Sequence, residues 1–213
     1  MNLYTDIVRP GLFRFHAETA HHIALTGLKL TPAPLVRALF GGAAEHPVRL
    51  FGLTFPNPVG LAAGMDKNAE VLGAWEALGF GFVEAGTVTA LAQPGNDKPR
   101  CFRYPRQHAL INRMGFNNLG AEAVARNLAG LKASGRWPRI PVGMNIGKSK
   151  VTALEDAPSD YAASFRRLAF GLDEREPPDS HAGAGQPGFS RHGHDGHDPA
   201  VAARRRSRGP GGR

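Results

Sequence analysis

The segment from Asn57 to Asn68, NPVGLAAGMDKN, combines residue types that suit a flat and negatively charged ligand. The small side chains of Ala62, Ala63 and Gly64 allow a planar ring to lie directly against the backbone. Lys67 follows closely and offers a positive charge to an anionic group. We therefore expect this segment to form the floor and one charged wall of a ligand site.

Further hydroxyl and amide side chains follow other predicted strands. Thr87 lies in the strand expected at 82–88, and Asn145 lies near the end of the strand expected at 141–146. An excursion between these strands carries INRMGFNN at 111–118, with three amides close together. Amide groups recognise planar imide or amide rings through paired donors and acceptors. Each segment alone is more often a packing or turn device, but the ordered set predicts one site at the carboxyl ends of the strands.

The elements that must position these residues alternate between strand and helix from 48 to 168. Repeated βα units of this kind predict an α/β fold with a parallel sheet, either closed as a barrel or open and doubly wound. The expected elements are a hairpin at 48–55, strands at 59–62, 82–88 and 141–146, helices at 69–78, 121–133 and from 160 to 168, and a two-stranded piece at 101–104 and 109–113.

The first 46 residues predict two or three short helices, because apolar residues recur between breaks at Pro10, Gly27 and the Pro32/Pro34 pair. One interpretation is a helical extension that packs on the main domain. The other is an amphipathic pair on a membrane surface, with basic side chains facing anionic lipid. The two interpretations are compatible. The basic residues concerned are Arg9, Arg14, Lys29 and Arg37.

Composition narrows the function classes only in part. The net charge of +8 over 213 residues favours anionic partners but does not choose among them. The single cysteine, Cys101, excludes an internal disulfide and indicates a reducing compartment. No apolar run is long enough for a membrane-spanning helix. Charged residues interrupt the apolar core that a signal peptide would need.

The chain changes character after Leu168, and residues 170–213 consist mainly of Gly, Pro, Arg, Asp, Ala and His. Such a segment buries too little apolar surface to offset its ordering entropy, so we expect a disordered tail. We expect no metal site among its histidines, since no helix or hairpin would fix their geometry. The terminal arginine cluster is weak evidence for nucleic acid, and we expect none as a partner. The histidines are His181, His192, His194 and His197.

Together these segments resemble the class 2, quinone-dependent and membrane-associated dihydroorotate dehydrogenases over residues 1 to about 168. The motifs that carry the resemblance are HAETAHHIAL, GLTFPNPVGLAAGMDKNAE, GFGFVEAGTVT, QPGNDKPRCFRYP, INRMGFNNLG and GMNIGKSK. The resemblance implies a (β/α)8 TIM barrel with FMN at its carboxyl-end face. We accordingly expect a helical quinone-tunnel region at 1–46, a partial barrel of about three βα units at 47–169, and the tail at 170–213.

The resemblance also implies roles for individual residues. His21 and Arg103 fall where the family lines its quinone site, although His21 could instead be a packing residue of an N-terminal helix. The residues that resemble the family's FMN-binding positions are Ala62, Ala63, Gly64, Lys67, Thr87 and Asn145. Those that resemble its substrate-binding positions are Lys67, Asn112, Arg113, Met114, Gly115 and Phe116.

In the family's reaction, dihydroorotate loses a proton from C5 to a serine base and a hydride from C6 to FMN, and ubiquinone or menaquinone then receives the electrons. The resemblance therefore implies a flavoprotein oxidoreductase of de novo pyrimidine (UMP) biosynthesis. It implies a location on the cytoplasmic side of the cell inner membrane, as a peripheral protein.

The family's barrel continues with a motif like NVSSPNTPGL, which carries the catalytic serine, and this sequence contains no counterpart. We assign the base to no residue and expect the chain as written to be inactive and without flavin. The abrupt change near residue 169 or 170 leads us to hypothesise a frameshift in a GC-rich gene. The alternatives are another FMN barrel oxidoreductase and a truncated, non-catalytic interaction module with a basic tail.

Overall fold

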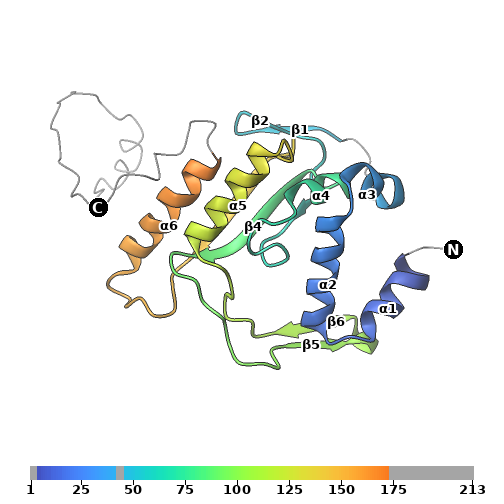
Figure 1. The fold of residues 1–213 in the computed structure, drawn as a ribbon, viewed down its shortest axis with the longest axis horizontal. Helices are drawn as coiled ribbons and strands as arrows, with labels where there is room; N and C mark the ends of the chain where they lie inside the picture. The colour runs from blue at the N-terminus through green and yellow to red at the C-terminus, as the bar shows by residue number, and fades with distance from the viewer. Residues whose placement is uncertain (1–3, 42–45, 173–213) are drawn as a thin grey trace, which may run out of the picture. The chain divides into compact units, whose positions relative to one another are not determined.

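The computed structural model describes residues 4–41 and 46–172 (Figure 1). These residues belong to one compact unit, residues 1–177, and a second unit comprises residues 178–213. The disorder expected for the tail and the absence of a metal site among its four histidines concern positions outside the described residues. Only the first three tail positions are described, because the last helix, α6, continues through them to Leu172.

The N-terminal region is helical, as the sequence predicts. A π-helical turn, η1 (Tyr4–Val8), leads into α1 (Arg9–Phe13), α2 (Ala17–Leu30) and α3 (Ala33–Phe40). Thr31 ends α2 by donating a side-chain hydrogen bond to the carbonyl oxygen of Gly27 at 2.7 Å. Among the described residues no single helix could cross a membrane, although α2 and α3, bent by 117°, satisfy the length and composition criteria as a pair.

Three parallel strands form the central sheet: β3 (Gly60–Leu61), β4 (Phe82–Thr89) and β7 (Val142–Gly147). They are neighbours in chain order, with β4 in the middle, and the β4–β7 register shifts between Ala85 and Val88. Sequential order is the arrangement of a barrel, and no switch point occurs within the three strands described. The expected partial α/β barrel is therefore confirmed.

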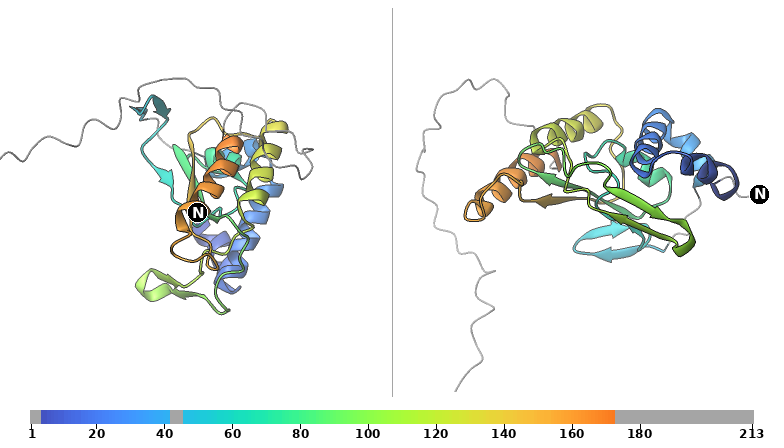
Figure 2. Two further views of the ribbon diagram at one scale, coloured as in Figure 1. Left: turned by 90° about the vertical axis from the view of Figure 1, so that its left-hand side faces the viewer. Right: turned by 90° about the horizontal axis from the view of Figure 1, so that it is seen from below.

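The helices that follow the strands cover the sheet and form the core with it. These are α4 (Leu72–Ala77), α5 (Ala121–Ala133) and α6 (Ala157–Leu172), and α5 lies beside α6 (Figures 1 and 2). Apolar residues recur at helical spacing on their inner faces and alternate along β4, so both patterns meet in one core. Its main members are Leu72, Trp75, Val83, Val88, Val124, Leu128 and Leu168.

Two antiparallel hairpins accompany the sheet, and both were predicted. The first pairs β1 (Val48–Leu50) with β2 (Leu53–Phe55). The second pairs β5 (Cys101–Tyr104) with β6 (Ala109–Asn112), which are joined by the short 3-10 helix η2 (Pro105–Gln107). The second hairpin belongs to the excursion between β4 and α5, so it carries residues of the candidate site.

Two helices start at residues other than those predicted. The helix expected from residue 160 begins three residues earlier, as α6 at Ala157. A helix was expected at 69–78, but α4 begins only at Leu72. The buried carboxylate of Asp66 accepts hydrogen bonds from the backbone N–H groups of Glu70 (2.8 Å) and Val71 (3.0 Å). Ala69 adopts a φ of +53°, which is incompatible with a right-handed helix. The side chain of Asp66 thus folds this stretch into a turn that precedes α4.

Candidate functional site

A pocket of about 860 Å³ gathers most of the predicted site residues. It lies at the carboxyl ends of β3 and β4 and is closed on other sides by α2 and the β5–β6 hairpin. Lining residues from segments that are distant in sequence thus share one cavity. The predicted residues in its wall are His21, Ala62, Ala63, Gly64, Lys67, Thr87, Arg103, Asn112, Met114, Gly115 and Phe116.

The floor of the pocket consists of small residues, and backbone hydrogen bonds between the β3 exit and β4 hold it in place. Gly64 donates its N–H to the carbonyl oxygen of Gly86 at 2.7 Å, and Gly86 donates to the carbonyl oxygen of Asp66 at 3.0 Å. Both glycines have φ values of +111°, a conformation that other residues adopt only with strain. A Cβ atom at Gly86 would lie 2.4 Å from the carbonyl oxygen of Asn145. Glycine is therefore required where the β3 and β4 loops meet.

Lys67 brings a positive charge into the pocket without a carboxylate partner among the described residues. Its Nζ donates to the carbonyl oxygen of Gly64 at 2.9 Å. Burial is the main cause that lowers the pKa of Lys67, and Arg100 lowers it further, while Glu18 and Cys101 oppose this shift. An anionic ligand at this position would supply the missing counter-charge.

Thr87 and Asn145 belong to neighbouring strands and hold one another. Thr87 Oγ1 donates to Asn145 Oδ1 at 2.6 Å, and Asn145 Nδ2 donates to Glu84 Oε1 at 3.0 Å. Thr87 lines the pocket, whereas Asn145 lies behind it and is not part of the wall. The structure brings both residues together at the site, and a direct contact between Asn145 and a cofactor stays a prediction.

Of the predicted substrate segment, residues 112–116, all but Arg113 line the pocket. Asn112 lines the wall, and its Oδ1 accepts the N–H of Met114 at 3.3 Å. Arg113 lies outside the wall, because its Nη2 donates to the carbonyl oxygen of Pro99 at 3.1 Å. Its backbone N–H bonds to the carbonyl oxygen of Arg100 at 2.9 Å. Arg113 therefore fastens the β6 exit to the preceding loop.

Asn118 and Gln93 support this segment, and sequence reasoning missed both roles. The side-chain amide of Asn118 donates to the carbonyl oxygen of Phe116 at 2.7 Å and accepts the N–H of Thr89 at 3.2 Å. Gln93 Nε2 donates to the carbonyl oxygen of Gly115 at 3.1 Å, and its Oε1 accepts the N–H of Lys150 at 2.9 Å. The amide of Asn118 was expected among the recognition groups, but its bonds go to the backbone and to the hydroxyl group of Thr89.

His21 and Arg103 face the pocket from opposite elements, α2 and β5. Burial, together with the positive charges of Lys67 and His22, lowers the pKa of His21 to about 4, so the imidazole is neutral at neutral pH. The guanidinium of Arg103 donates to the carbonyl oxygen of Phe15 at 2.8 Å and lies 4.6 Å from the ring centre of Phe13. This end of the pocket thus combines a neutral imidazole with a guanidinium that is held against an aromatic ring.

A buried ion pair that the sequence did not predict joins α2 to the excursion. Glu18 is only 4% exposed and accepts two bonds from Arg100, at 2.6 Å from Nη2 and 3.1 Å from Nε. Arg100 Nη1 also donates to the carbonyl oxygens of Pro94 (2.6 Å) and Asn96 (2.8 Å). The bidentate pair holds the pKa of Glu18 below its ordinary value. It fixes the helix that carries His21.

Comparison with known proteins identifies the family. A family model described as dihydroorotate dehydrogenase matches residues 46–173. The dihydroorotate dehydrogenase (quinone) of Gloeobacter violaceus is 54% identical over 173 residues, which cover 79% of this chain and 47% of that protein. The corresponding protein of Salinispora arenicola is 54% identical over 174 residues, which cover 78% of this chain and 50% of that protein.

A solved structure, that of the Eimeria tenella enzyme DHODH in complex with ferulenol, matches with a TM-score of 0.59 and 38% identity. The match covers 72% of this chain and 41% of that structure. The chain thus spans about half the length of the curated relatives it matches. Its sequence, its sheet order and these matches agree, and the chain belongs to the dihydroorotate dehydrogenase family, in which it matches the class 2, quinone-dependent members.

Proposed function

We propose that this chain supplies the cofactor floor and the substrate wall of a quinone-dependent dihydroorotate dehydrogenase, an oxidoreductase of de novo pyrimidine biosynthesis. The enzyme oxidises (S)-dihydroorotate to orotate and passes the electrons to ubiquinone or menaquinone. The observation that carries the proposal is the convergence of α2, the β3 and β4 exits and the segment 112–116 on one pocket. These are the segments that the family resemblance assigns to the reaction.

The pocket residues fit FMN. Ala62, Ala63 and Gly64 present a flat, small-residue surface, and a side chain at Gly64 would be strained by its φ of +111°. Lys67 offers an unpaired positive charge, which suits a ring that becomes anionic on reduction. Thr87, fixed by Asn145, offers a hydroxyl group. When bound, FMN would supply the hydride-accepting and electron-transferring chemistry.

The substrate proposal depends on charge and amide recognition in the same wall. Lys67 is positioned to attract the carboxylate of dihydroorotate, and Asn112 offers an amide to the pyrimidine ring. Arg113 would contribute indirectly, because its bond to Pro99 holds the backbone of Met114 and Gly115 in the wall. Gln93 holds the same backbone through its bond to Gly115. These residues bind and orient the substrate, whereas the proton-accepting serine has no counterpart in the sequence.

The quinone proposal concerns the end of the pocket between α2 and β5. His21 is neutral and Arg103 is held by Phe13 and Phe15, so this end suits a weakly polar ring with an apolar tail. Exposed apolar residues also occur elsewhere in the N-terminal region and suit a membrane surface, which the family resemblance assigns to the cytoplasmic side of the cell inner membrane. These residues include Ile7, Phe13, Phe15, Leu35 and Leu39.

A chimera tests the proposal. Residues 1–172 would be joined to the portion of the Gloeobacter violaceus relative that lies beyond the matched region. We expect the purified chimera to show flavin absorbance and to reduce a quinone with dihydroorotate, and its Lys67→Met variant to lose most turnover. The 213-residue chain alone is expected to show neither property, since it lacks the serine motif needed for turnover and spans only about half of the length of its relatives. A chimera that melts cooperatively but never binds flavin would contradict the proposal.

A further inference from the structure

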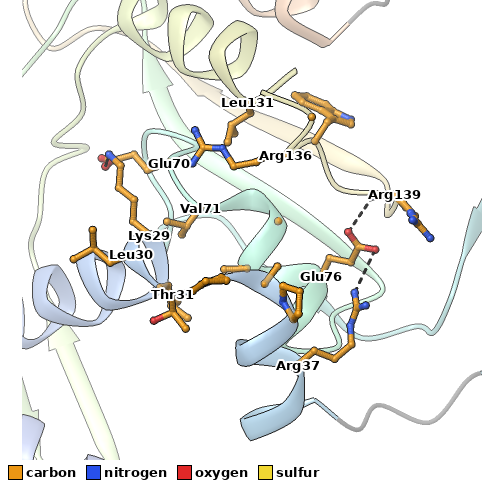
Figure 3. A pocket seen from close by; sticks show the side chains of 18 residues that line it. Lys29, Leu30, Thr31, Arg37, Glu70, Val71, Glu76, Leu131, Arg136 and Arg139 are labelled. Carbon is orange, nitrogen blue, oxygen red and sulfur yellow. Dashed lines mark hydrogen bonds and ion pairs between the residues drawn. The ribbon is translucent and has the colours of Figure 1, made fainter. Parts of the chain in front are cut away.

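A second pocket, of about 580 Å³, lies on a different part of the described chain (Figure 3). It is formed by the junction of α2 and α3, by α4 and by the loop 135–139, which precedes β7. It shares no lining residue with the candidate functional site. Its volume is within the range of small-ligand sites. The loop that closes it leads into the amino end of β7. Active sites of α/β barrels lie at the opposite, carboxyl ends of the strands.

The pocket carries more positive than negative charge. Four basic side chains line it, against the two carboxylates of Glu70 and Glu76. Lys29 Nζ is 3.2 Å from Glu70 Oε2, and an arginine on α3 is 3.9 Å from Glu76 Oε1. The two remaining guanidinium groups have no carboxylate partner among the described residues. The basic residues are Lys29, Arg37, Arg136 and Arg139.

The loop that supplies two of the arginines is held in place at both ends. Its first residues cap α5, since Gly135 N–H bonds to the carbonyl oxygen of Lys132 at 3.0 Å and Arg136 N–H to that of Leu131 at 2.9 Å. At the other end the backbone N–H of Arg139 donates to Glu76 Oε2 at 3.1 Å. A fixed backbone reduces the entropy that the loop would lose on binding a ligand.

The side chain of Arg136 is the best placed of the unpaired groups. Figure 3 shows it extending between Leu131 and Val71 toward the side of the pocket where Lys29 and Glu70 lie. Its Nε donates to Ser134 Oγ at 2.9 Å, so one edge of the guanidinium is fixed. The terminal nitrogens retain donors for a ligand. Guanidinium groups bind phosphate oxygens bidentately, which a lysine cannot do.

We propose that this pocket binds a phosphate-bearing anion, held by Arg136 and Lys29 and attracted by Arg37 and Arg139. The excess of two positive charges matches the charge of a phosphate monoester at neutral pH. Glu70 competes with the ligand for Lys29, so this carboxylate limits the affinity. The anion is either a free phosphorylated metabolite or the headgroup of an anionic lipid, because both present the same phosphate oxygens.

The test uses the 213-residue chain with inorganic phosphate as the probe, at low ionic strength, by isothermal titration and phosphorus NMR. We expect Arg136→Gln to weaken phosphate binding about tenfold, the effect of one lost charge-assisted contact. Glu70→Gln is expected to strengthen it several-fold. Arg126→Gln is the matched control, because Arg126 is exposed on α5, pairs with Glu122 and lies outside the pocket. Circular dichroism melting confirms that each variant is folded.

A second arm identifies the source of the phosphate. Vesicles of phosphatidylcholine with one quarter phosphatidylglycerol are sedimented with the chain and with Arg136→Gln. Reduced sedimentation of the variant, against the Arg126→Gln control, supports a lipid headgroup, and unchanged sedimentation with weakened phosphate binding supports a soluble anion. Equal losses in Arg136→Gln and Arg126→Gln, or no phosphate binding by the unaltered chain, would overturn the proposal. None of these measurements depends on flavin binding, so their outcome is independent of the proposed enzymatic function.

Discussion

The N-terminal helices and the three-stranded sheet use apolar side chains in opposite ways. Val83 and Val88 of β4 are fully buried, and helix α5 covers them with residues such as Leu128. In the N-terminal region, Leu30 at the end of α2 is 78% exposed and Phe15, in the turn before α2, is 50% exposed. The sheet gains stability from burying its apolar residues, whereas much of the apolar surface of the N-terminal region lies exposed and contributes little to stability within this chain.

The largest expected effect compares one leucine from each region. Leu128→Ala removes a fully buried side chain from the core and should lower the free energy of unfolding by about 2–5 kcal/mol. Leu30→Ala removes an exposed one and should change it by less than about 0.5 kcal/mol. Urea unfolding followed by circular dichroism measures both. Equal losses in the two variants would show that the exposed helical surface is packed in solution.

The second prediction concerns the ion pair that joins α2 of the N-terminal region to the excursion between β4 and α5. Glu18→Gln leaves the buried Arg100 without its counter-charge and should cost about 3 kcal/mol of stability at neutral pH. The pKa of Glu18 is below its ordinary value of 4.5 in the folded chain. Its contribution is therefore present above about pH 4.5 and is lost as the pH falls through the lower folded pKa.

Unfolding free energies measured from pH 7 to pH 3 test this prediction. The difference between the unaltered chain and Glu18→Gln should shrink on the acid side and stay constant toward neutral pH. Glu122→Gln, on the exposed surface of α5, serves as the control and should show a far smaller difference. A constant difference at all pH values would mean that the Glu18 charge does not stabilise the junction.

The third prediction tests how the segment after β4 supports the candidate site. Gln93→Glu keeps the acceptor for Lys150 N–H but loses the donor to Gly115, whereas Gln93→Met loses both bonds. We expect a loss of about 1 kcal/mol for each bond removed. Hydrogen exchange should show the Lys150 amide protected in Gln93→Glu and unprotected in Gln93→Met. Identical exchange in both variants would exclude the proposed bridging role of Gln93.

Local sequence patterns predicted the elements whose boundaries depend on near neighbours. Helix α5 has the predicted limits, because Gly120 and Gly135 flank a run with apolar residues at helical spacing. The start of α4 could not be predicted in the same way. The turn around Asp66 depends on its buried carboxylate and on the ring nitrogen of Trp75, 3.2 Å away. Burial of this kind is settled by the fold and not by residue type.

The same distinction applies to the candidate site. The floor at Ala62, Ala63 and Gly64 comes from one continuous motif, so its character was visible in the sequence. The Glu18–Arg100 pair joins residues 82 positions apart. No periodicity or composition specifies such a partner, because the pair depends on how two segments approach in space. Arg113 was placed with the substrate residues; its side chain donates to the carbonyl oxygen of Pro99, and a contact with the substrate stays a prediction.

Flavin retention by the chimera of residues 1–172 with the Gloeobacter violaceus portion tests the central claim most directly. Ala62 lines the floor and is exposed to the pocket, so Ala62→Phe should block a planar ring without disturbing the core. Val59→Phe, at an exposed position outside the pocket, is the control. We predict that the parent and Val59→Phe retain flavin absorbance and that Ala62→Phe loses it while still unfolding cooperatively, at the melting temperature of the flavin-free parent. Equal flavin content in all three proteins would contradict the assignment of the pocket.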